Sequence, residues 1–426
     1  MEKQSRKDLT MKRIIGLSLI LLYHCAILAQ NPLEQASGYD PELKAILEKA
    51  EEHEIQILYT QINRDSDGNP IFTDYSWKLD SYRYYYPAST VKMPVAALAL
   101  EKLNELQIEE LHAASPMKSH AARKIQTADF LDSKSETGFQ SVDHYVKQIF
   151  LVSDNNAFNR LYEWLGQEYI YEKLQEKGFQ QSRIIHRLSV SGFDTLENQY
   201  TNPVSFYGED GELLYHKGLV KSKAPHAPLT QKVFNTIKGK GYYDSSLDSV
   251  IMTPFDFTHK NFISLSDLHG ILKSLIFDEY LPSHQRFNIS ASDRKRMLTY
   301  MGMRPRESEY PDYDSTYYDS YVKFFMFGTD STQMPASIRI FNKVGWAYGY
   351  LTDVAYIVDL ENNVEFLLSA TIHVNQNQIY NDGNYEYDTI GLPFFDLLGS
   401  YIYEFELERK KTGAVPVTYY RDLFEK

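Results

Sequence analysis

The spacing of apolar residues near the start of the chain predicts one helix followed by two strands. Residues 40–53 carry apolar side chains at a helical period, and Asp40-Pro41 is a typical beginning for a helix. Residues 55–62 and 71–79 have strand character, and the Asp-, Gly- and Pro-containing segment between them predicts a turn. We therefore expect a helix, a strand, a tight turn and a second strand.

A helical block is predicted for the middle of the chain. Residues 87–106 form the most apolar helical stretch outside the first thirty residues. Two segments without a clear period, at about residues 190–261 and 304–320, contain several prolines and are predicted to be irregular insertions. Helical periods elsewhere predict helices at residues 142–150, 155–165, 169–177, 264–277 and 290–300.

Strand character dominates towards the end of the chain. The predicted strands are residues 336–341, 351–359 and 364–373, and residues 393–409 form a final amphipathic helix. Because strands occur at both ends and helices between them, the order predicts an α+β fold. We expect an antiparallel sheet flanked by N- and C-terminal helices, with an all-helical lobe inserted. The predicted sheet lobe comprises residues 30–86 and 330–426, and the predicted helical lobe comprises residues 87–329.

The first 29 residues have the pattern of an export signal. Met11-Lys12-Arg13 supplies positive charge, residues 14–22 form an apolar run, and Ala29 is a suitable end for a cleaved segment. The run is too short to span a membrane comfortably, and no later segment has the character of a span. The pattern predicts a secreted, periplasmic protein. A second interpretation attaches a lipid to Cys25, although bulky residues precede it.

Charge and cysteine content narrow the classes of function. The formal net charge is −13, and Lys and Arg form no basic stripe, so we expect no nucleic-acid partner. Cys25 is the only cysteine, so cleavage after Ala29 leaves a chain without disulfides, cysteine nucleophiles or cysteine metal ligands. The 12 histidines show no metal-ligand spacing such as His-Glu-x-x-His. We expect neither a metal nor another cofactor.

Ser89 and Lys92 are the strongest candidates for a nucleophile and its base. Serine needs a base to take its proton, and a lysine three residues later on a helix lies about one turn away. Ser89 opens the apolar helix, so burial is expected to lower the pKa of the Lys92 amine. Two other Ser-x-x-Lys sequences begin at Ser115 and Ser320, but both lie in polar connecting segments and are interpreted as chance.

Two further short motifs carry groups that suit acyl transfer. Ser153-Asp154-Asn155 precedes a predicted helix and is interpreted either as a helix N-cap or as a second catalytic serine with its neighbouring amide. Lys343-Val344-Gly345 follows a predicted strand, where the lysine can bind a substrate carboxylate or tune a neighbouring serine and the glycine lets a substrate backbone approach closely. Lys411-Thr412-Gly413 has a similar pattern, but no strand follows it.

Ser-x-x-Lys, Ser-Asp-Asn and Lys-x-Gly in this order resemble the motifs of class A serine β-lactamases and penicillin-binding proteins. The resemblance covers most of the chain in element order and implies an acyl-enzyme mechanism. It implies that Ser89 is acylated, that Lys92 helps to deprotonate it, and that Ser153 passes a proton to the leaving nitrogen. It also implies that Asn155 holds Lys92 and the substrate amide, and that Lys343 supports Ser153 and attracts the substrate carboxylate.

The same resemblance assigns the groups that surround the substrate. Gly345, Trp346 and Asp154 are the implied substrate-binding residues. The backbone N–H groups of Ser89 and Trp346 are the implied oxyanion hole, where one donor is typically worth about 100- to 1000-fold in rate. Val344 departs from the family pattern, because a hydroxyl residue usually stands there and donates a hydrogen bond to a β-lactam carboxylate.

The group that removes the acyl chain is a second departure from the pattern. Class A enzymes place a glutamate on a loop after the second motif to activate the deacylating water, and Ser189 stands at that position here. Glu197 is the nearest candidate for the deacylation base, and its alternative interpretation is a solvated loop carboxylate.

The motifs together predict a periplasmic serine hydrolase that hydrolyses β-lactams through a Ser89 acyl-enzyme. One alternative is a D,D-carboxypeptidase or esterase that acts on cell-wall peptides. The other is a catalytically inactive protein that resembles the penicillin-binding proteins. The expected partner is accordingly a small molecule, either a β-lactam or a peptidoglycan peptide.

Overall fold

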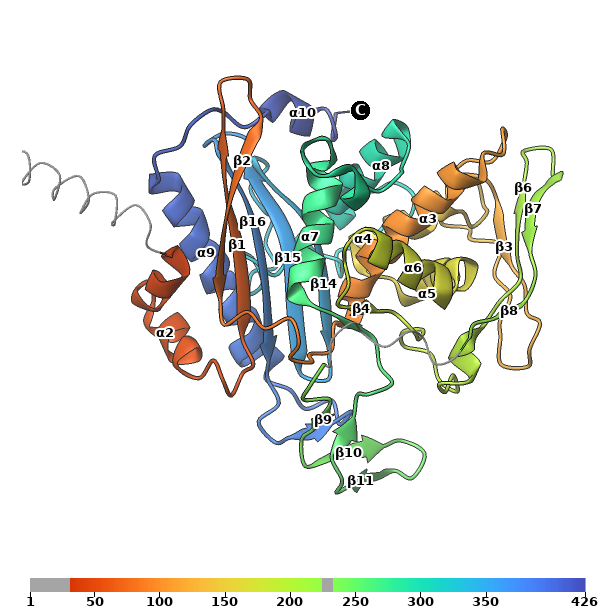
Figure 1. Cartoon of the computed structure of the whole chain (residues 1–426), viewed down its shortest axis with the longest axis horizontal. Coiled ribbons are helices and arrows are strands. Elements are labelled where there is room, and N and C mark those ends of the chain that lie inside the picture. Colours follow the sequence, from red (N-terminus) through yellow and green to blue (C-terminus); the bar gives the residue numbers. More distant parts are fainter. Residues whose placement is uncertain (1–30, 224–232, 426) are drawn as a thin grey trace, which may run out of the picture.

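The computed structural model describes residues 31–223 and 233–425 and is built around a five-stranded antiparallel sheet (Figure 1). The predicted export signal, with Cys25, lies outside these residues. The strand order is β14-β15-β16-β1-β2, so strands from both ends of the chain lie side by side. The strands are β1 (Gln56–Arg64), β2 (Pro70–Trp77), β14 (Ile338–Ala347), β15 (Tyr350–Asp359) and β16 (Val364–His373).

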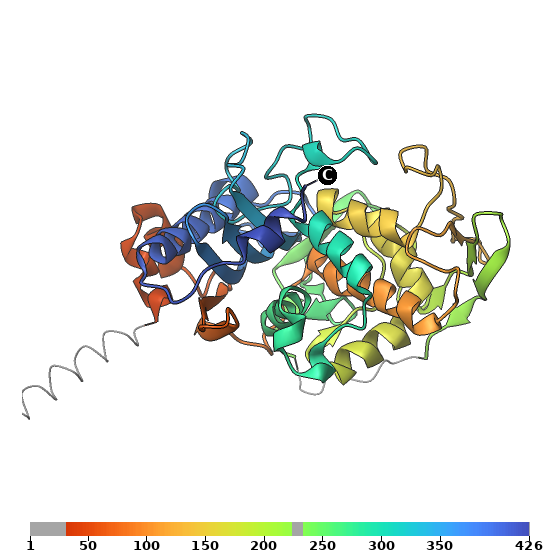
Figure 2. The same ribbon diagram turned by 90° about the horizontal axis from the view of Figure 1, so that it is seen from above.

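Helices cover both faces of this sheet (Figures 1 and 2). The N-terminal helix α2 (Pro41–Glu48) and the C-terminal helix α9 (Leu392–Glu408) lie on one face, and α7 (Leu265–Ile276) lies on the other. Successive side chains of a strand point to opposite faces. Along β15, Val354 and Tyr356 therefore pack with the α7 side, whereas Ala355 packs with the α2 and α9 side. Both faces are buried, which explains the almost continuous apolar sequence of this strand.

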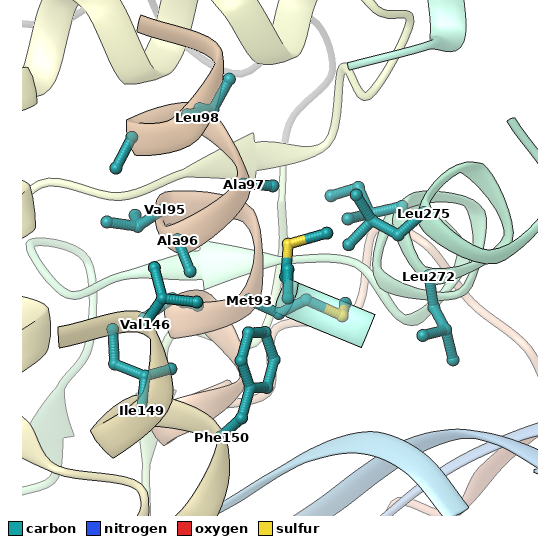
Figure 3. Packing of buried hydrophobic residues seen from close by; sticks show 14 of the residues in the cluster. Met93, Val95, Ala96, Ala97, Leu98, Val146, Ile149, Phe150, Leu272 and Leu275 are labelled. Atoms are coloured by element: carbon teal, nitrogen blue, oxygen red, sulfur yellow. The ribbon is translucent and has the colours of Figure 1, made fainter. Parts of the chain in front are cut away.

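The inserted lobe is centred on α3 (Lys92–Leu106). This helix is buried nearly all round, as expected for a helix without a polar face. Figure 3 shows its apolar side chains between those of α4 (Val142–Val152) and α7. The other helices of the lobe are α5 (Asn155–Leu165), α6 (Gln167–Glu176) and α8 (Ala291–Gly302). Within the described residues, no helix combines the length and the apolar character that a membrane span requires.

The predicted α+β fold is confirmed, and the structure adds short strands to it, all but one of which lie within residues 87–329. Most of these strands fall in the segment that was expected to be irregular, between residues 190 and 261. Strands of two to five residues are too short to show an alternating pattern in the sequence. They are β3 (Met117–Ser119), β4 (Ser182–Arg183), β5 (Tyr200–Thr201), β6 (Val204–Tyr207), β7 (Leu213–Lys217), β8 (Val220–Lys221), β9 (Ile237–Lys238), β10 (Gly241–Asp244), β11 (Ser249–Ile251), β12 (Phe255–Asp256), β13 (Phe262–Ile263) and β17 (Ile379–Tyr380).

Candidate active site

Ser89 lies in a tight turn that leads into the largely buried helix α3. The turn is the 3-10 helix η2 (Ala88–Val91), which continues directly into α3. Ala88 has a φ of 46°, a left-handed conformation that side chains other than glycine rarely adopt. Ser89 lines two adjoining cavities of about 430 and 210 Å³, so the predicted nucleophile stands in a cleft.

Lys92 is completely buried one turn after Ser89. Its Nζ donates hydrogen bonds to Asn155 Oδ1 at 2.8 Å, to Ser153 Oγ at 3.3 Å and to the Ser153 carbonyl oxygen. Burial lowers the pKa of the Lys92 amine well below its ordinary value, and repulsion from the nearby Lys343 lowers it further. The lowered pKa makes the neutral amine, which is the form that can accept a proton from serine, easier to reach.

The second motif forms the turn between α4 and α5, and its three residues have different tasks. Asp154 is the N-cap of α5, because its side chain accepts the Ala157 N–H at 2.8 Å. Ser153, with a φ of 58°, and Asn155 direct their side chains to Lys92. Ser153 and Asn155 line the cleft, whereas Asp154 does not line either of the two cavities around Ser89. The helix-cap interpretation thus fits Asp154, and the catalytic interpretation fits Ser153 and Asn155.

Lys343 reaches the same serine from the sheet. It lies on β14, and its Nζ donates to Ser153 Oγ at 2.9 Å and to the Val344 carbonyl oxygen at 2.9 Å. Burial lowers the pKa of Lys343 to about 7, and the nearby Asp353 carboxylate opposes this shift. Ser153 Oγ consequently bridges two buried amines, one from each lobe.

Gly345 and Trp346 place the edge of the sheet against the Ser89 turn. A Cβ atom on Gly345 would lie 2.5 Å from the Pro87 carbonyl oxygen and 2.9 Å from the Ser89 nitrogen, so only glycine permits this approach. Trp346 is 47% exposed at the mouth of the cleft, and its ring stacks on Phe324 at 5.7 Å. Both residues line the 210 Å³ cavity.

Glu197 is not brought to the cleft, which corrects its expected place beside the acyl group. It forms a bidentate ion pair with Arg123, with Nε–Oε2 and Nη2–Oε1 distances of 3.0 and 2.5 Å. It lines neither cavity that contains Ser89. Ser189, at the position where class A enzymes have glutamate, lines both of them. Among the described residues that line these two cavities, none is Asp or Glu.

Three asparagines that the sequence analysis did not single out hold the loop around Ser189. Asn159 Oδ1 accepts the Leu188 N–H at 2.8 Å, and its Nδ2 donates to the Leu188 carbonyl oxygen at 3.0 Å. Asn198 accepts the Arg187 N–H at 2.9 Å, and Asn261 accepts the Ile185 N–H at 2.8 Å. No sequence motif marks these residues, because the peptide groups that they bind lie far away along the chain.

A buried polar network behind Lys343 was also missed. Lys323 is buried, and its Nζ donates to Asn342 Oδ1 at 3.0 Å and to the Ile340 carbonyl oxygen at 2.7 Å. Asn342 Nδ2 in turn donates to Asp353 Oδ1 at 2.8 Å. Lys323 belongs to the Ser320-x-x-Lys323 sequence, but the Ser320 hydroxyl donates to the Asp330 carbonyl oxygen instead of pairing with this lysine. The network fixes β14 where Lys343 emerges.

A serine at the start of a buried helix, with two lysines and a bridging serine between a sheet and a helical lobe, is the arrangement expected of β-lactamase-type serine hydrolases. Within the described residues, no three His, Cys, Asp or Glu side chains gather as a metal site. The side chains that meet beside Ser89 carry hydroxyl, amine and amide groups.

Residues 39–212 match the sequence model of the β-lactamase enzyme family. This segment contains Ser89, Lys92, Ser153 and Asn155, and over this segment the match confirms the resemblance that the first two motifs predicted. No curated protein matches the chain.

Several solved structures are similar to this chain. A β-lactamase from Desulfarculus baarsii is 13% identical, covers 86% of this chain and 98% of its own, and has a TM-score of 0.45. A β-lactamase from Sphaerobacter thermophilus is 12% identical, covers 88% of this chain and 99% of its own, and has a TM-score of 0.44. A class A β-lactamase from Mycobacterium abscessus is 12% identical, and the match covers 85% of this chain and 97% of the β-lactamase, with a TM-score of 0.41.

Proposed function

We propose that this protein is an exported serine hydrolase that β-lactams acylate at Ser89. The observation that carries the proposal is the hydrogen-bonded chain of Lys92, Ser153 and Lys343 beside Ser89, because it provides a base, a proton relay and a positive charge in one cleft. The proposed location outside the cytoplasm is supported by the signal pattern of the first 29 residues.

In the proposed first step, the neutral Lys92 amine takes the proton of Ser89 as the serine oxygen attacks the lactam carbonyl carbon. The O–C bond forms and the carbonyl oxygen becomes an oxyanion. When the tetrahedral intermediate collapses, the C–N bond of the ring breaks, and Ser153 delivers a proton to the nitrogen. Lys92 returns its proton to Ser153. Protonated Lys343 attracts the substrate carboxylate, which compensates in part for the missing hydroxyl at Val344.

Hydrolysis of the resulting ester requires a base for water, and the described lining of the Ser89 cavities offers no carboxylate for that task. The same observation favours a second candidate function, a D,D-peptidase that β-lactams inhibit. We therefore expect acylation by penicillins to be fast in comparison with release of the acyl group.

A time course with a fluorescent penicillin tests both functions. Labelling should appear in the wild-type protein and be absent from Ser89→Ala, and the label should persist after excess unlabelled penicillin is added. Rapid loss of the label would favour a β-lactamase. Hydrolysis of an N-acyl-D-alanyl-D-alanine peptide would favour a D,D-peptidase. Absence of labelling together with absence of peptide hydrolysis would leave only the inactive binding protein.

A further inference from the structure

A third cavity, which we call the distal cavity, continues the cleft beyond Ser89. Its volume is about 550 Å³, larger than either cavity that contains Ser89. It shares Tyr86, Ser189 and Tyr348 with the 430 Å³ cavity. A substrate that is attached at Ser89 can therefore extend into the distal cavity without leaving the cleft.

The distal cavity lies on the acyl side of the proposed reaction. Ser153 and Val344 line the 210 Å³ cavity, and Ser153 is the residue that gives its proton to the leaving nitrogen. The leaving group consequently occupies the 210 Å³ cavity. The 430 Å³ cavity contains Ser89 but not Ser153, and it shares three lining residues with the distal cavity, whereas the 210 Å³ cavity shares only Ser189 with it. The acyl side chain is thus directed towards the distal cavity.

Two cations that have no acidic partner within the described residues line this cavity. The Arg183 Nη2 atom donates to the Thr258 carbonyl oxygen at 2.6 Å, and its Nε is buried without a described partner. The Lys260 amine forms no ion pair within the described residues and is 5.9 Å from the centre of the Phe255 ring. Burial lowers the pKa of both groups, so an anion beside them would relieve an unfavourable environment.

The other charged residues of the lining already have partners. Arg187 donates from Nε to Glu163 Oε1 at 2.7 Å. Asp194, the one carboxylate among the described lining residues, accepts the Glu197 N–H at 2.7 Å. Lys260 and Arg183 are thus the lining cations without an ion pair, and the single Asp194 carboxylate leaves the described lining with an excess of positive charge.

His186 adds a buried hydrogen-bond acceptor to the same cavity. Its Nδ1 is 2.6 Å from the Arg187 carbonyl oxygen, so this nitrogen carries the proton and donates it. Burial lowers the pKa of His186 to about 4, which keeps the ring neutral at physiological pH. The opposite nitrogen, Nε2, is then an acceptor, and it is buried without a described partner. A ligand amide or hydroxyl group would satisfy it.

The fold holds the segments that carry Lys260 and Arg183 in place. Lys260 comes from the segment expected to be irregular, where Phe255 and Phe257 each pack on Tyr348 with ring centres 5.5 Å apart. Arg183 lies on β4, which pairs with β13, and β13 begins two residues after Lys260. The aromatic contacts and the strand pairing hold both cations at the cavity.

We propose that the distal cavity binds a carboxylate at the far end of the substrate's acyl side chain, with Lys260 and Arg183 as its charge partners. The inference rests on the proposed function, because that function determines which side of Ser89 receives the acyl group. It adds a substrate class, namely acyl donors with an anionic end. It also assigns a substrate-binding role to the segment that carries Lys260.

The test compares penicillins that differ only in charge at the end of the side chain. Glutaryl and adipoyl penicillins with a free terminal carboxylate are matched with their terminal amides, and the second-order rate constant for acylation is measured. We expect the carboxylates to be preferred by about 10- to 100-fold, the value of one hydrogen bond to a charged group. Lys260→Gln should bring this ratio close to one, and Lys260→Glu should reverse it. Lys49→Gln, the same charge change at an exposed site on the sheet lobe, should leave it unchanged.

A ratio near one in the wild-type protein, or a ratio that Lys260→Gln does not alter, would overturn the proposal. The same side chains on D-alanyl-D-alanine show whether β-lactams or peptides carry the preferred group. If neither the penicillins nor the D-alanyl-D-alanine peptides acylate the protein, the proposed function is wrong. The carboxylate site is then tested by ligand binding alone. NMR titration should then show that adipic acid monoamide binds Ser89→Ala more tightly than adipamide does, and that Lys260→Gln abolishes the difference. Equal binding would refute the site.

Discussion

Gly345→Ala tests whether contact between the sheet edge and the Ser89 turn assembles the site. The new Cβ would lie 2.5 Å from the Pro87 carbonyl oxygen, 2.9 Å from the Ser89 nitrogen and 3.0 Å from the Thr90 nitrogen. All three are backbone atoms, so no side-chain rotation can relieve the contact. Ordinary van der Waals contact begins at 3.4 Å, so strand and turn must separate by about 0.9 Å.

This separation should affect acylation more than stability. A displacement of about 1 Å at reacting groups can cost about 100-fold in rate. Overpacking of a buried contact typically costs about 1–3 kcal/mol in the free energy of unfolding. We therefore expect the acylation rate constant for a fluorescent penicillin to fall by about 100-fold, while urea unfolding shows a folded protein with a loss in this range.

Gly38→Ala is the matched control for this substitution. Nothing lies within 4 Å of a Cβ at Gly38, and its φ is outside the left-handed region. It should acylate at the wild-type rate. Wild-type acylation by Gly345→Ala would show that close packing of β14 on the turn is not needed, and would refute the assembly of the site from two lobes.

The charges and hydrogen bonds in and around the cleft should also determine the pH dependence of acylation, the lifetime of the acyl-enzyme and the stability of the loop around Ser189. Acylation should rise with pH as Lys92 loses its proton and should level off well below 10.5, whereas affinity for the substrate carboxylate should fall as pH rises through about 7 and Lys343 becomes neutral. Both effects are measured by the pH dependence of the maximal acylation rate and of the penicillin concentration that gives half of this rate. If that concentration does not change with pH in the wild type, the role of Lys343 is contradicted. Glu197→Gln should leave the lifetime of the acyl-enzyme unchanged, because its carboxylate is paired away from the cleft, while Ser189→Glu should shorten that lifetime by about 10-fold or more by supplying a base. A longer lifetime in Glu197→Gln, measured by chase of the label, would restore that residue as the deacylation base. Asn159→Ala should reduce the free energy of unfolding by about 1–3 kcal/mol, because two buried peptide groups lose their partners, and an unchanged urea midpoint would refute this.

The motifs were predictable because each is short and lies on an element with a strong pattern. Ser89 and Lys92 lie within four residues at the start of an unusually apolar helix, so their relation needs no knowledge of the rest of the chain. The third motif was placed after a strand that was expected to end at residue 341. In the structure β14 continues to Ala347, because it pairs with β15 along its whole length. Pairing overrides the break that Asn342 and Gly345 introduce into the apolar pattern.

The loop and insertion were not predictable in the same way. Glu197 is separated from Arg123 by 74 positions, and no pattern in the sequence around either residue predicts their ion pair. Lys260 and Arg183 come together through a strand pair of two residues on each side, which leaves no periodic signal. The predicted division into residues 30–86 with 330–426 and residues 87–329 stays a prediction, since a shared sheet does not show that either part folds independently.

The most direct test of acylation at Ser89 is mass spectrometry of the intact protein after reaction with benzylpenicillin, followed by peptide mapping. The structure leads us to expect one adduct per chain with the full mass of the penicillin, located on the peptide that contains Ser89. It should be absent from Ser89→Ala and should still be present after free penicillin is removed. An adduct on another residue would contradict the assignment of Ser89 as the nucleophile. Consumption of penicillin by the Ser89→Ala variant would contradict it as well.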